Sequence, residues 1–261
     1  MTTAMRILVL GAGGTGGYFG GRLAQAGADV TFLVRPARAA RLREHGLVIR
    51  SPHGDAQLPV QSITADQAAA WGRADLVLLS CKAYDLEDAI TAIRPVVGER
   101  TPHAPRERTE AIRDVFATAN FDSVLADNVM QDMWEKFTFL TSLAAMTCLM
   151  RATVGEIVAT DEGAALNEAM FMACERVAAA SGYPNRQAAR ERGLNVLTQA
   201  GSPLTASMLR DLESGARVEA DHIVGDMLRR GRALGTDVSL LRVAFAHLQA
   251  YQQRLLRPAA G

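Results

Sequence analysis

The sequence contains little cysteine and has no excess of charge of either sign. Its three cysteines, Cys81, Cys148 and Cys174, lie far apart and form no CxxC pair. This spacing indicates reduced thiols in a cytoplasmic protein rather than a disulfide framework. Lysine plus arginine and aspartate plus glutamate balance at 28 each, which argues against a nucleic acid or a membrane surface as a partner. Recognition of an anionic ligand must therefore depend on local charge.

Long apolar runs and metal-ligand spacings are also missing. The apolar run at residues 7–10 is too short for the core of a signal peptide, and no small-residue cleavage pattern follows it. The most apolar helical stretch, residues 137–150, is shorter than a bilayer span. The histidines are scattered without the spacing of metal ligands, so we expect no metal. The sequence thus predicts a soluble cytoplasmic protein.

Glycine, in contrast, is concentrated near the start of the chain. The apolar run leads directly into the pattern Gly11-x-Gly13-x-x-Gly16 and then into apolar residues at helical spacing. Strand, glycine turn and helix in this order are the context of a dinucleotide-binding fingerprint, and a tight turn in another α/β protein is the alternative. We expect Gly11 to permit the turn, Gly13 with Gly14 to let the backbone approach a pyrophosphate, and Gly16 to let the helix pack closely.

The residue after the second predicted strand, 29–34, indicates which dinucleotide is bound. NAD-binding folds place an acidic residue about 20 residues past the glycines, where it holds the ribose 2′-hydroxyl. This chain has Arg35 there, with Arg38 close behind. A guanidinium matches a 2′-phosphate in shape and charge, so we predict NADP(H) rather than NAD(H). A solvated loop arginine is the alternative.

A later strand ends at a second basic residue. Residues 75–80 form a nearly continuous apolar run, typical of a strand buried on both faces, and Lys82 and Tyr84 follow it. Ligands bind beyond the carboxyl ends of such strands, so Lys82 could reach the cofactor phosphates and Tyr84 could pack on a ring. A surface lysine at a strand end is the alternative. Two short β segments, 47–50 and 57–61, lie between these strands.

The centre of the chain lacks strands that such a domain should contain. A doubly wound dinucleotide domain continues to roughly 150 residues, yet a polar stretch with prolines follows residues 89–95, and a predicted helix follows at 107–119. Either an internal deletion or the omission of a segment explains this gap. We therefore expect an α/β fold class with three parts: a truncated Rossmann-type parallel sheet over 1–100, a linker over 101–124 and an all-helical substrate and dimerisation domain over 125–261.

The second half has helical periodicity throughout. One run of apolar residues recurs at helical spacing, at Val129, Met133, Phe137, Leu140 and Leu143. Further helices are predicted over 162–181, 186–199, 207–212, 218–234 and 240–255. Gly182 and Gly235 are expected as C-terminal caps. A helical half after an α/β half predicts a two-domain enzyme with its active site in a cleft.

Three polar residues in this half are candidates for chemistry. Lys136 precedes a strongly apolar stretch, so its ammonium lies at the edge of a low-dielectric surface, as a proton donor requires. Periodicity alone favours a surface pair between Asp132 and Lys136 over this role. Judged by position alone, Ser207 is a residue typical of the start of a helix. Glu219 is likewise an acidic residue of the kind that stabilises the first turn of a helix.

These stretches together resemble a known family. The segments GAGGTGGYFGGRLAQAG (11–27), VTFLVR (30–35) and DLVLLSCKAYDLEDAI (75–90) closely resemble the NADPH-binding half of ketopantoate reductases, also called 2-dehydropantoate 2-reductases. The resemblance implies that Arg35 and Lys82 contact the NADPH phosphates. It breaks in the centre, where the family has an Asn-Gly element and further strands that this chain lacks.

The resemblance resumes in the helical half. The segment Trp134-Glu135-Lys136-Phe137 matches the W-x-K element of the family, which implies that Lys136 donates a proton to the substrate carbonyl oxygen. By position, Ser207 would bind the substrate carboxylate, and Glu219 would orient the substrate hydroxyl and the lysine. Leu140 and Ala144 stand where well-known members have asparagines, which predicts a more apolar pocket and a paralogous branch.

The resemblance implies an NADPH-dependent reductase of pantothenate biosynthesis or a related pathway. It would reduce a small 2-keto acid similar to ketopantoate to the 2-hydroxy acid, by hydride transfer with lysine as general acid, and a homodimer fits this class. Two alternatives stay open. One is an NADPH-binding protein whose catalysis is impaired by the central gap. The other is a further NADP-linked hydroxyacid dehydrogenase, although the Gly-rich substrate loop of β-hydroxyacid dehydrogenases has no evident counterpart here.

Overall fold

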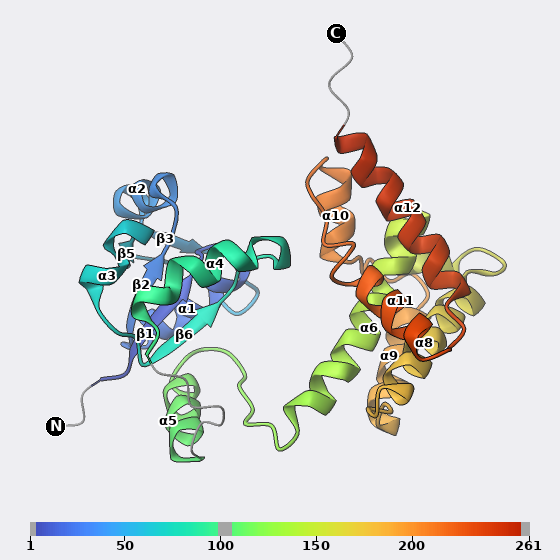
Figure 1. Ribbon diagram of the computed structural model, residues 1–261, viewed down its shortest axis with the longest axis horizontal. Helices are drawn as coiled ribbons and strands as arrows, with labels where there is room; N and C mark the ends of the chain where they lie inside the picture. The colour runs from blue at the N-terminus through green and yellow to red at the C-terminus, as the bar shows by residue number, and fades with distance from the viewer. Residues whose placement is uncertain (1–3, 99–105, 257–261) are drawn as a thin grey trace, which may run out of the picture. The chain divides into compact units, whose positions relative to one another are not determined.

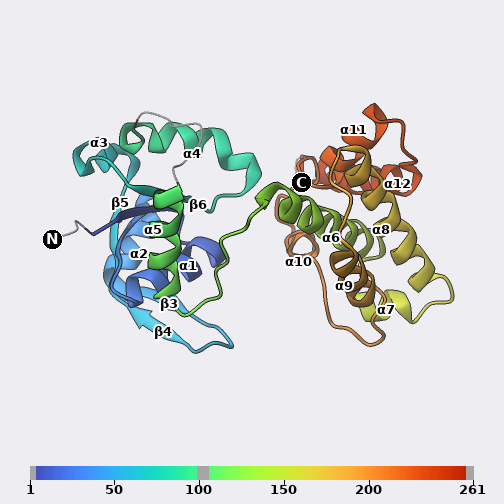
Figure 2. The same ribbon diagram turned by 90° about the horizontal axis from the view of Figure 1, so that it is seen from below.

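The computed structural model describes residues 4–98 and 106–256. It divides into two compact units, Met1–Leu125 and Ala126–Gly261 (Figures 1 and 2). The boundary lies at the end of the region expected as a linker. The two units differ in secondary structure, since the described part of the first contains the β-strands and that of the second is helical. The structure therefore confirms the expected α/β fold class with a helical C-terminal region.

The first unit is built on a parallel sheet with the order β5-β2-β1-β6. Its strands are β1 (Arg6–Leu10), β2 (Asp29–Leu33), β5 (Gln61–Ile63) and β6 (Leu76–Leu79). The register aligns Leu10 with Leu33 on one side and with Leu79 on the other. The carboxyl ends of three strands consequently meet at one edge of the sheet.

Helices cover both faces of this sheet. They are α1 (Gly14–Gln25), α2 (Pro36–His45), α3 (Ala68–Trp71) and α4 (Leu86–Ile93), with short 3-10 turns η1 (Ala65–Gln67), η2 (Ala83–Asp85) and η3 (Arg94–Val96). Along β1, Ile7 and Val9 pack in one apolar cluster with Leu23 of α1. Leu8 packs in another cluster with Ile93 of α4. This alternation shows why the strands are apolar on both faces.

One predicted β segment, 57–61, is wrong as a single element. The structure has two strands there: β4 (Ala56–Leu58) pairs antiparallel with β3 (Leu47–Ile49), and β5 begins at Gln61 in the parallel sheet. Pro59 lies between them. Because proline has no N–H to donate to a ladder, it ends one pairing and allows the chain to change partners.

The segment that starts at Arg106 packs on the first unit. Helix α5 (Arg106–Ala117) contributes Phe116 to the same apolar cluster as α1, and Phe121 follows it there. The ring of Phe121 lies edge-on to Phe19 of α1, with centroids 5.0 Å apart. Arg108 donates to the Asp75 carbonyl at 2.6 Å, beside the start of β6. In the described part of this unit the sheet has four strands, with β6 at one edge.

The second unit is a bundle around one long helix. Its helices are α6 (Val129–Met150), α7 (Val154–Val158), α8 (Gly163–Ala180), α9 (Gln187–Leu197), α10 (Ser207–Glu213), α11 (Val224–Ala233) and α12 (Ser239–Leu255). Helix α6 starts where the Asn128 side chain accepts the Gln131 N–H, and it packs against α8, α10 and α12 (Figure 2). Gly182 and Gly235 follow α8 and α11 with positive φ, as helix C-terminal glycines do.

The predicted helix over 218–234 starts later than expected. Helix α11 begins only at Val224, and Glu219 lies in the turn before it. Val218 and Ala220 are buried in the core of the bundle, so packing rather than helical propensity determines this stretch. Within the described residues, no helix combines the length and the apolar character needed to cross a membrane.

Candidate functional site

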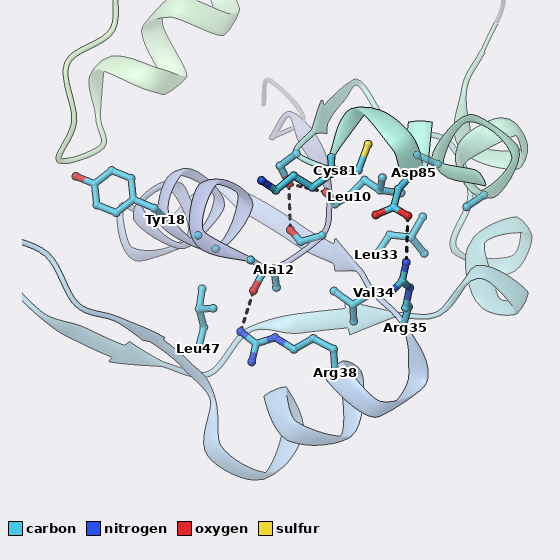
Figure 3. Close-up of a pocket in the computed structure, with 18 of the residues that line it drawn as sticks. Leu10, Ala12, Tyr18, Leu33, Val34, Arg35, Arg38, Leu47, Cys81 and Asp85 are labelled. Carbon is cyan, nitrogen blue, oxygen red and sulfur yellow. Dashed lines mark hydrogen bonds and ion pairs between the residues drawn. The ribbon is translucent and has the colours of Figure 1, made fainter. Parts of the chain in front are cut away.

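A cavity of about 1080 Å³ opens at the edge of the sheet where the parallel strands end (Figure 3). Leu10 and Leu33 line it from the ends of β1 and β2, and Ser80 and Lys82 line it from the loop after β6. Ligands of open α/β sheets bind at this edge because loops diverge there and helices begin there. The residues that the sequence predicted as cofactor ligands gather around this cavity.

The glycine-rich loop forms one wall of the cavity. Gly11 has φ +92°, a conformation that favours glycine, and its N–H donates to the Leu33 carbonyl at 2.9 Å. Gly13 and Gly14 line the cavity, and a Cβ added at either would meet only open space. Their bare backbone therefore faces the cavity at the N-terminus of α1, where N–H groups and the helix dipole favour an anion.

Gly16 lies behind this wall rather than along it. A Cβ at this position would be 2.2 Å from the Gly11 carbonyl oxygen and 2.1 Å from Ser80 Oγ. The Ser80 hydroxyl donates to the Leu10 carbonyl at 2.5 Å. The third glycine thus lets α1 approach both the turn and the loop after β6.

Two arginines follow β2 and reach the cavity in different ways. Arg35 is the N-cap residue of α2, and its largely exposed guanidinium pairs with the Asp85 carboxylate at 3.6 Å. Arg38, one turn into α2, donates to the Ala12 carbonyl at 2.8 Å (Figure 3). Arg38 therefore connects α2 to the glycine-rich loop. In the sequence, the only sign of this contact is that Arg38 closely follows Arg35.

The loop after β6 contributes residues of both charges. Lys82 lines the cavity and precedes η2, and Asp85 at the end of η2 lines it too. Sequence reasoning identified Lys82 but missed Asp85, together with Asp66 and Asp88 on the same lining. Tyr84, expected to pack on a ring, belongs to η2 and is not among the described residues that line the cavity.

A dinucleotide fits the exposed backbone of Gly13 and Gly14, the N-terminus of α1 and the basic side chains around the cavity. The cavity is large enough to take much of such a ligand, since ligand pockets commonly measure about 300–1,000 Å³. The backbone of Gly13 and Gly14 fits a pyrophosphate, and Arg35 and Lys82 can approach further phosphate oxygens. The donor set therefore suits a dinucleotide.

The second unit holds the three residues expected to handle substrate. Lys136 lies on the exposed side of α6, together with Met133 and Leu140, which are spaced by three and four residues. Ser207 is the first residue of α10, a helix that packs against α6, and it is exposed. Glu219 is half-buried in the turn before α11, and its carbonyl accepts the N–H groups of residues 222 and 223.

The neighbours of Lys136 are held firmly in place. The Trp134 ring stacks on Tyr183 with centroids 5.7 Å apart, and Trp134 is buried. Glu135 accepts the Arg186 backbone N–H at 2.9 Å and its Nε–H at 2.7 Å. The Arg186 hydrogen bonds lower the pKa of Glu135 to about 2. These contacts orient the helix, so Lys136 is directed away from the bundle.

Asp132, the partner that periodicity offered to Lys136, pairs with Arg186 instead. Arg186 was not found by sequence reasoning, because it lies 51 residues along the chain from Glu135. The composition itself singles out two basic residues. Lys82 and Lys136 are the only lysines in the sequence, and every other residue in the Lys and Arg total is arginine.

The glycine-rich loop and the cavity are typical of the dinucleotide-binding class of proteins, here with a helical second unit. Two family models match the chain: ketopantoate reductase PanE/ApbA over residues 7–104, and the C-terminal region of the same family over residues 128–252. Together they cover most of the chain, so the protein belongs to the ketopantoate reductase family. Its members bind NAD(P)H as a nicotinamide cofactor.

The chain is similar to the uncharacterised oxidoreductase YkpB of Bacillus subtilis, at 28% identity over 95% of this chain and 99% of the relative. That alignment spans 303 positions, more than the 261 residues present here. YkpB therefore has residues without a counterpart in this chain.

Three solved structures share the fold. The PanE/ApbA family ketopantoate reductase of Ralstonia eutropha superposes with a TM-score of 0.85 at 23% identity, covering 97% of this chain and all of that one. A D-mandelate dehydrogenase with NADH and anilino(oxo)acetate gives 0.83 at 16%, covering 96% and 99%. The dimeric ketopantoate reductase of Staphylococcus aureus gives 0.79 at 19%, covering 96% and all of that chain.

Proposed function

We propose that the protein reduces a 2-keto acid to the 2-hydroxy acid with NADPH as the hydride donor. The observation that carries this proposal is the cavity at the carboxyl edge of the sheet, where the bare glycine backbone, Arg35 and Lys82 surround one space. Membership of the ketopantoate reductase family supports the reaction class. When bound, the nicotinamide supplies the hydride.

In this proposal the first unit holds the cofactor through charge and bare backbone. Gly11, Gly13 and Gly14 let the chain approach the pyrophosphate, and Gly16 keeps the start of α1 in place beside it. Lys82 neutralises phosphate oxygens as a point charge. Arg35 presents a planar fork to the 2′-phosphate.

Lys136 is the proposed proton donor to the substrate keto oxygen. Negative charge develops on that oxygen as the carbonyl is reduced, so an ammonium there stabilises the transition state more than the ground state. Of the two strongly basic side chains, lysine can also release its proton, whereas the arginine guanidinium stays charged. A lysine at this position of an otherwise arginine-rich chain supports this role.

Ser207 and Glu219 are proposed to position the substrate. The Ser207 hydroxyl would donate to the substrate carboxylate. Glu219 would orient the hydroxyl side of the substrate and Lys136. A homodimer is proposed by likeness to the dimeric Staphylococcus aureus enzyme.

A specific observation favours a substrate more apolar than ketopantoate. Leu140 lies one turn after Lys136 on the exposed face of α6, and exposed Met133 lies one turn before it. An apolar surface on both sides of the proton donor suits an aromatic or branched side chain. The likeness to a D-mandelate dehydrogenase supports this second candidate.

The test is NADPH oxidation by the purified protein with ketopantoate and, separately, with phenylglyoxylate, the 2-keto acid that corresponds to mandelate. We expect turnover with at least one of them, and loss of turnover by about 10²–10⁴-fold in Lys136→Ala with NADPH affinity nearly unchanged. Tight NADPH binding without turnover on either acid would indicate a binding protein whose catalysis is impaired. A Lys136→Ala variant that keeps most of its turnover would contradict the proton-donor role.

A further inference from the structure

An ion pair crosses the cavity between two loops that are distant in sequence. The Arg35 guanidinium follows β2, the Asp85 carboxylate follows β6, and 3.6 Å separate Arg35 Nη2 from Asp85 Oδ1. Both residues line the cavity, and Figure 3 shows the two side chains meeting over its rim. The carboxylate therefore lies against the guanidinium that the proposed function assigns to the 2′-phosphate.

Asp85 stands directly before a helix, where its carboxylate could have had a different partner. Asp85 is the N-cap residue of α4, and its N–H donates to the Lys82 carbonyl at 2.9 Å. Aspartate at an N-cap commonly accepts a helix N–H group with its own carboxylate. Here the carboxylate makes no capping hydrogen bond and pairs with Arg35.

The position of Asp85 supplies what the end of β2 lacks. NAD-binding folds use an acidic side chain after the second strand to accept a hydrogen bond from the ribose 2′-hydroxyl. In this chain the second strand ends in Arg35, and the tertiary structure brings a carboxylate to the same guanidinium from the loop after β6. One rim of the cavity thus holds both an arginine suited to a 2′-phosphate and an acid suited to a 2′-hydroxyl.

We propose that Asp85 is a specificity-determining residue that narrows the preference of the site for NADPH over NADH. Its carboxylate occupies the Arg35 guanidinium and opposes the charge of a 2′-phosphate, whereas it accepts a hydrogen bond from the 2′-hydroxyl of NADH. This inference deepens the proposed function, because it rests on Arg35 as the phosphate-binding arginine.

The size of the effect follows from exposure. The Arg35 side chain is 84% exposed and that of Asp85 is 36% exposed, so water and salt screen the interaction. Replacing Asp85 by asparagine keeps the shape and removes the charge. We expect Asp85→Asn to tighten NADPH binding by about three- to tenfold and to weaken NADH binding by about two- to fivefold. The change for NADPH should shrink as salt concentration rises.

The experiment is titration calorimetry of the full-length protein and its variants with NADPH and NADH, at low and high salt. Asp88→Asn is the matched control. Asp88 also lines the cavity, but it lies on α4 one turn beyond Asp85, the residue that pairs with Arg35. It should change the ratio of the two affinities by less than about twofold. Opposite movement of the two affinities in Asp85→Asn alone supports the proposal.

Three outcomes overturn it. Weaker NADPH binding in Asp85→Asn would mean that the carboxylate orients Arg35 for the phosphate. Equal loss for both cofactors would indicate a merely structural role, and equal changes in Asp88→Asn would indicate the general charge of the cavity. Arg35→Ala separates this inference from the proposed function. If Arg35→Ala leaves NADPH affinity unchanged, or the protein binds neither cofactor, the proposed phosphate site fails and the inference fails with it.

Discussion

The two units of this protein position their candidate functional residues in physically different ways. In the first unit the key atoms belong to the backbone: Gly13 and Gly14 expose it to the cavity, and Gly16 allows two segments to approach. In the second unit the key atoms belong to side chains, and the contacts of Trp134 and Glu135 orient the helix that carries Lys136. Backbone requirements restrict the residue type to glycine, whereas side-chain positioning permits many solutions. The first half is therefore far easier to interpret from sequence than the second.

The largest expected effect uses the two lysines, one in each unit, as a matched pair. Lys136→Arg keeps the charge but removes a dissociable proton, so we expect turnover to fall by about 10²–10⁴-fold. Lys82→Arg keeps the point charge that phosphates need, so NADPH affinity should weaken by less than about tenfold. Steady-state kinetics and cofactor titration of both variants check this. Equal losses of turnover in the two variants would remove the distinction between a proton donor and an electrostatic ligand.

The next prediction tests the backbone account of the first unit. Gly16→Ala puts a Cβ against Gly11 O and Ser80 Oγ, so the free energy of unfolding should fall by about 1–3 kcal/mol. Gly13→Ala meets open space, so stability should stay within about 0.5 kcal/mol while cofactor affinity falls. Urea denaturation and NADPH titration of both variants separate the two effects. If Gly13→Ala binds NADPH like the parent protein, the backbone at that position does not contact the pyrophosphate.

The smallest effect concerns stability and pH in the second unit. Arg186 lowers the pKa of Glu135 to about 2 from an ordinary value of 4.5. A depressed pKa in the folded protein means that the ionised pair stabilises the fold above pH 4.5, and that this contribution disappears as pH falls toward 2. Because Arg186 is largely exposed, we expect Glu135→Gln to lower the free energy of unfolding by about 1–2 kcal/mol at pH 7.

The measurement is urea denaturation of the parent protein and Glu135→Gln at pH 7 and near pH 3. The difference between them should be smaller at the lower pH. A difference that stays constant across this range would show that the ion pair is not its source.

Several features were predicted well because they are local. The strands at 29–34 and 75–80 and the capping glycines Gly182 and Gly235 depend on short patterns of apolar residues and on one backbone conformation. The errors arose where distant packing acts. The segment 57–61 divides between two sheets, and residues 218–223 lie outside α11 because Val218 and Ala220 are buried in the bundle.

By itself, the sequence determined the family, the parallel-sheet half and the helical half, and it supplied the candidates for phosphate binding and proton donation. It could do so because glycine turns, strand ends and the W-x-K element are short and carry their own chemistry. Only the tertiary structure decided that Asp85 meets Arg35, that Arg38 holds the glycine-rich loop and that Arg186 anchors Glu135. Each of these contacts joins side chains to groups that are distant in sequence, and their distances depend on how the helices and strands pack.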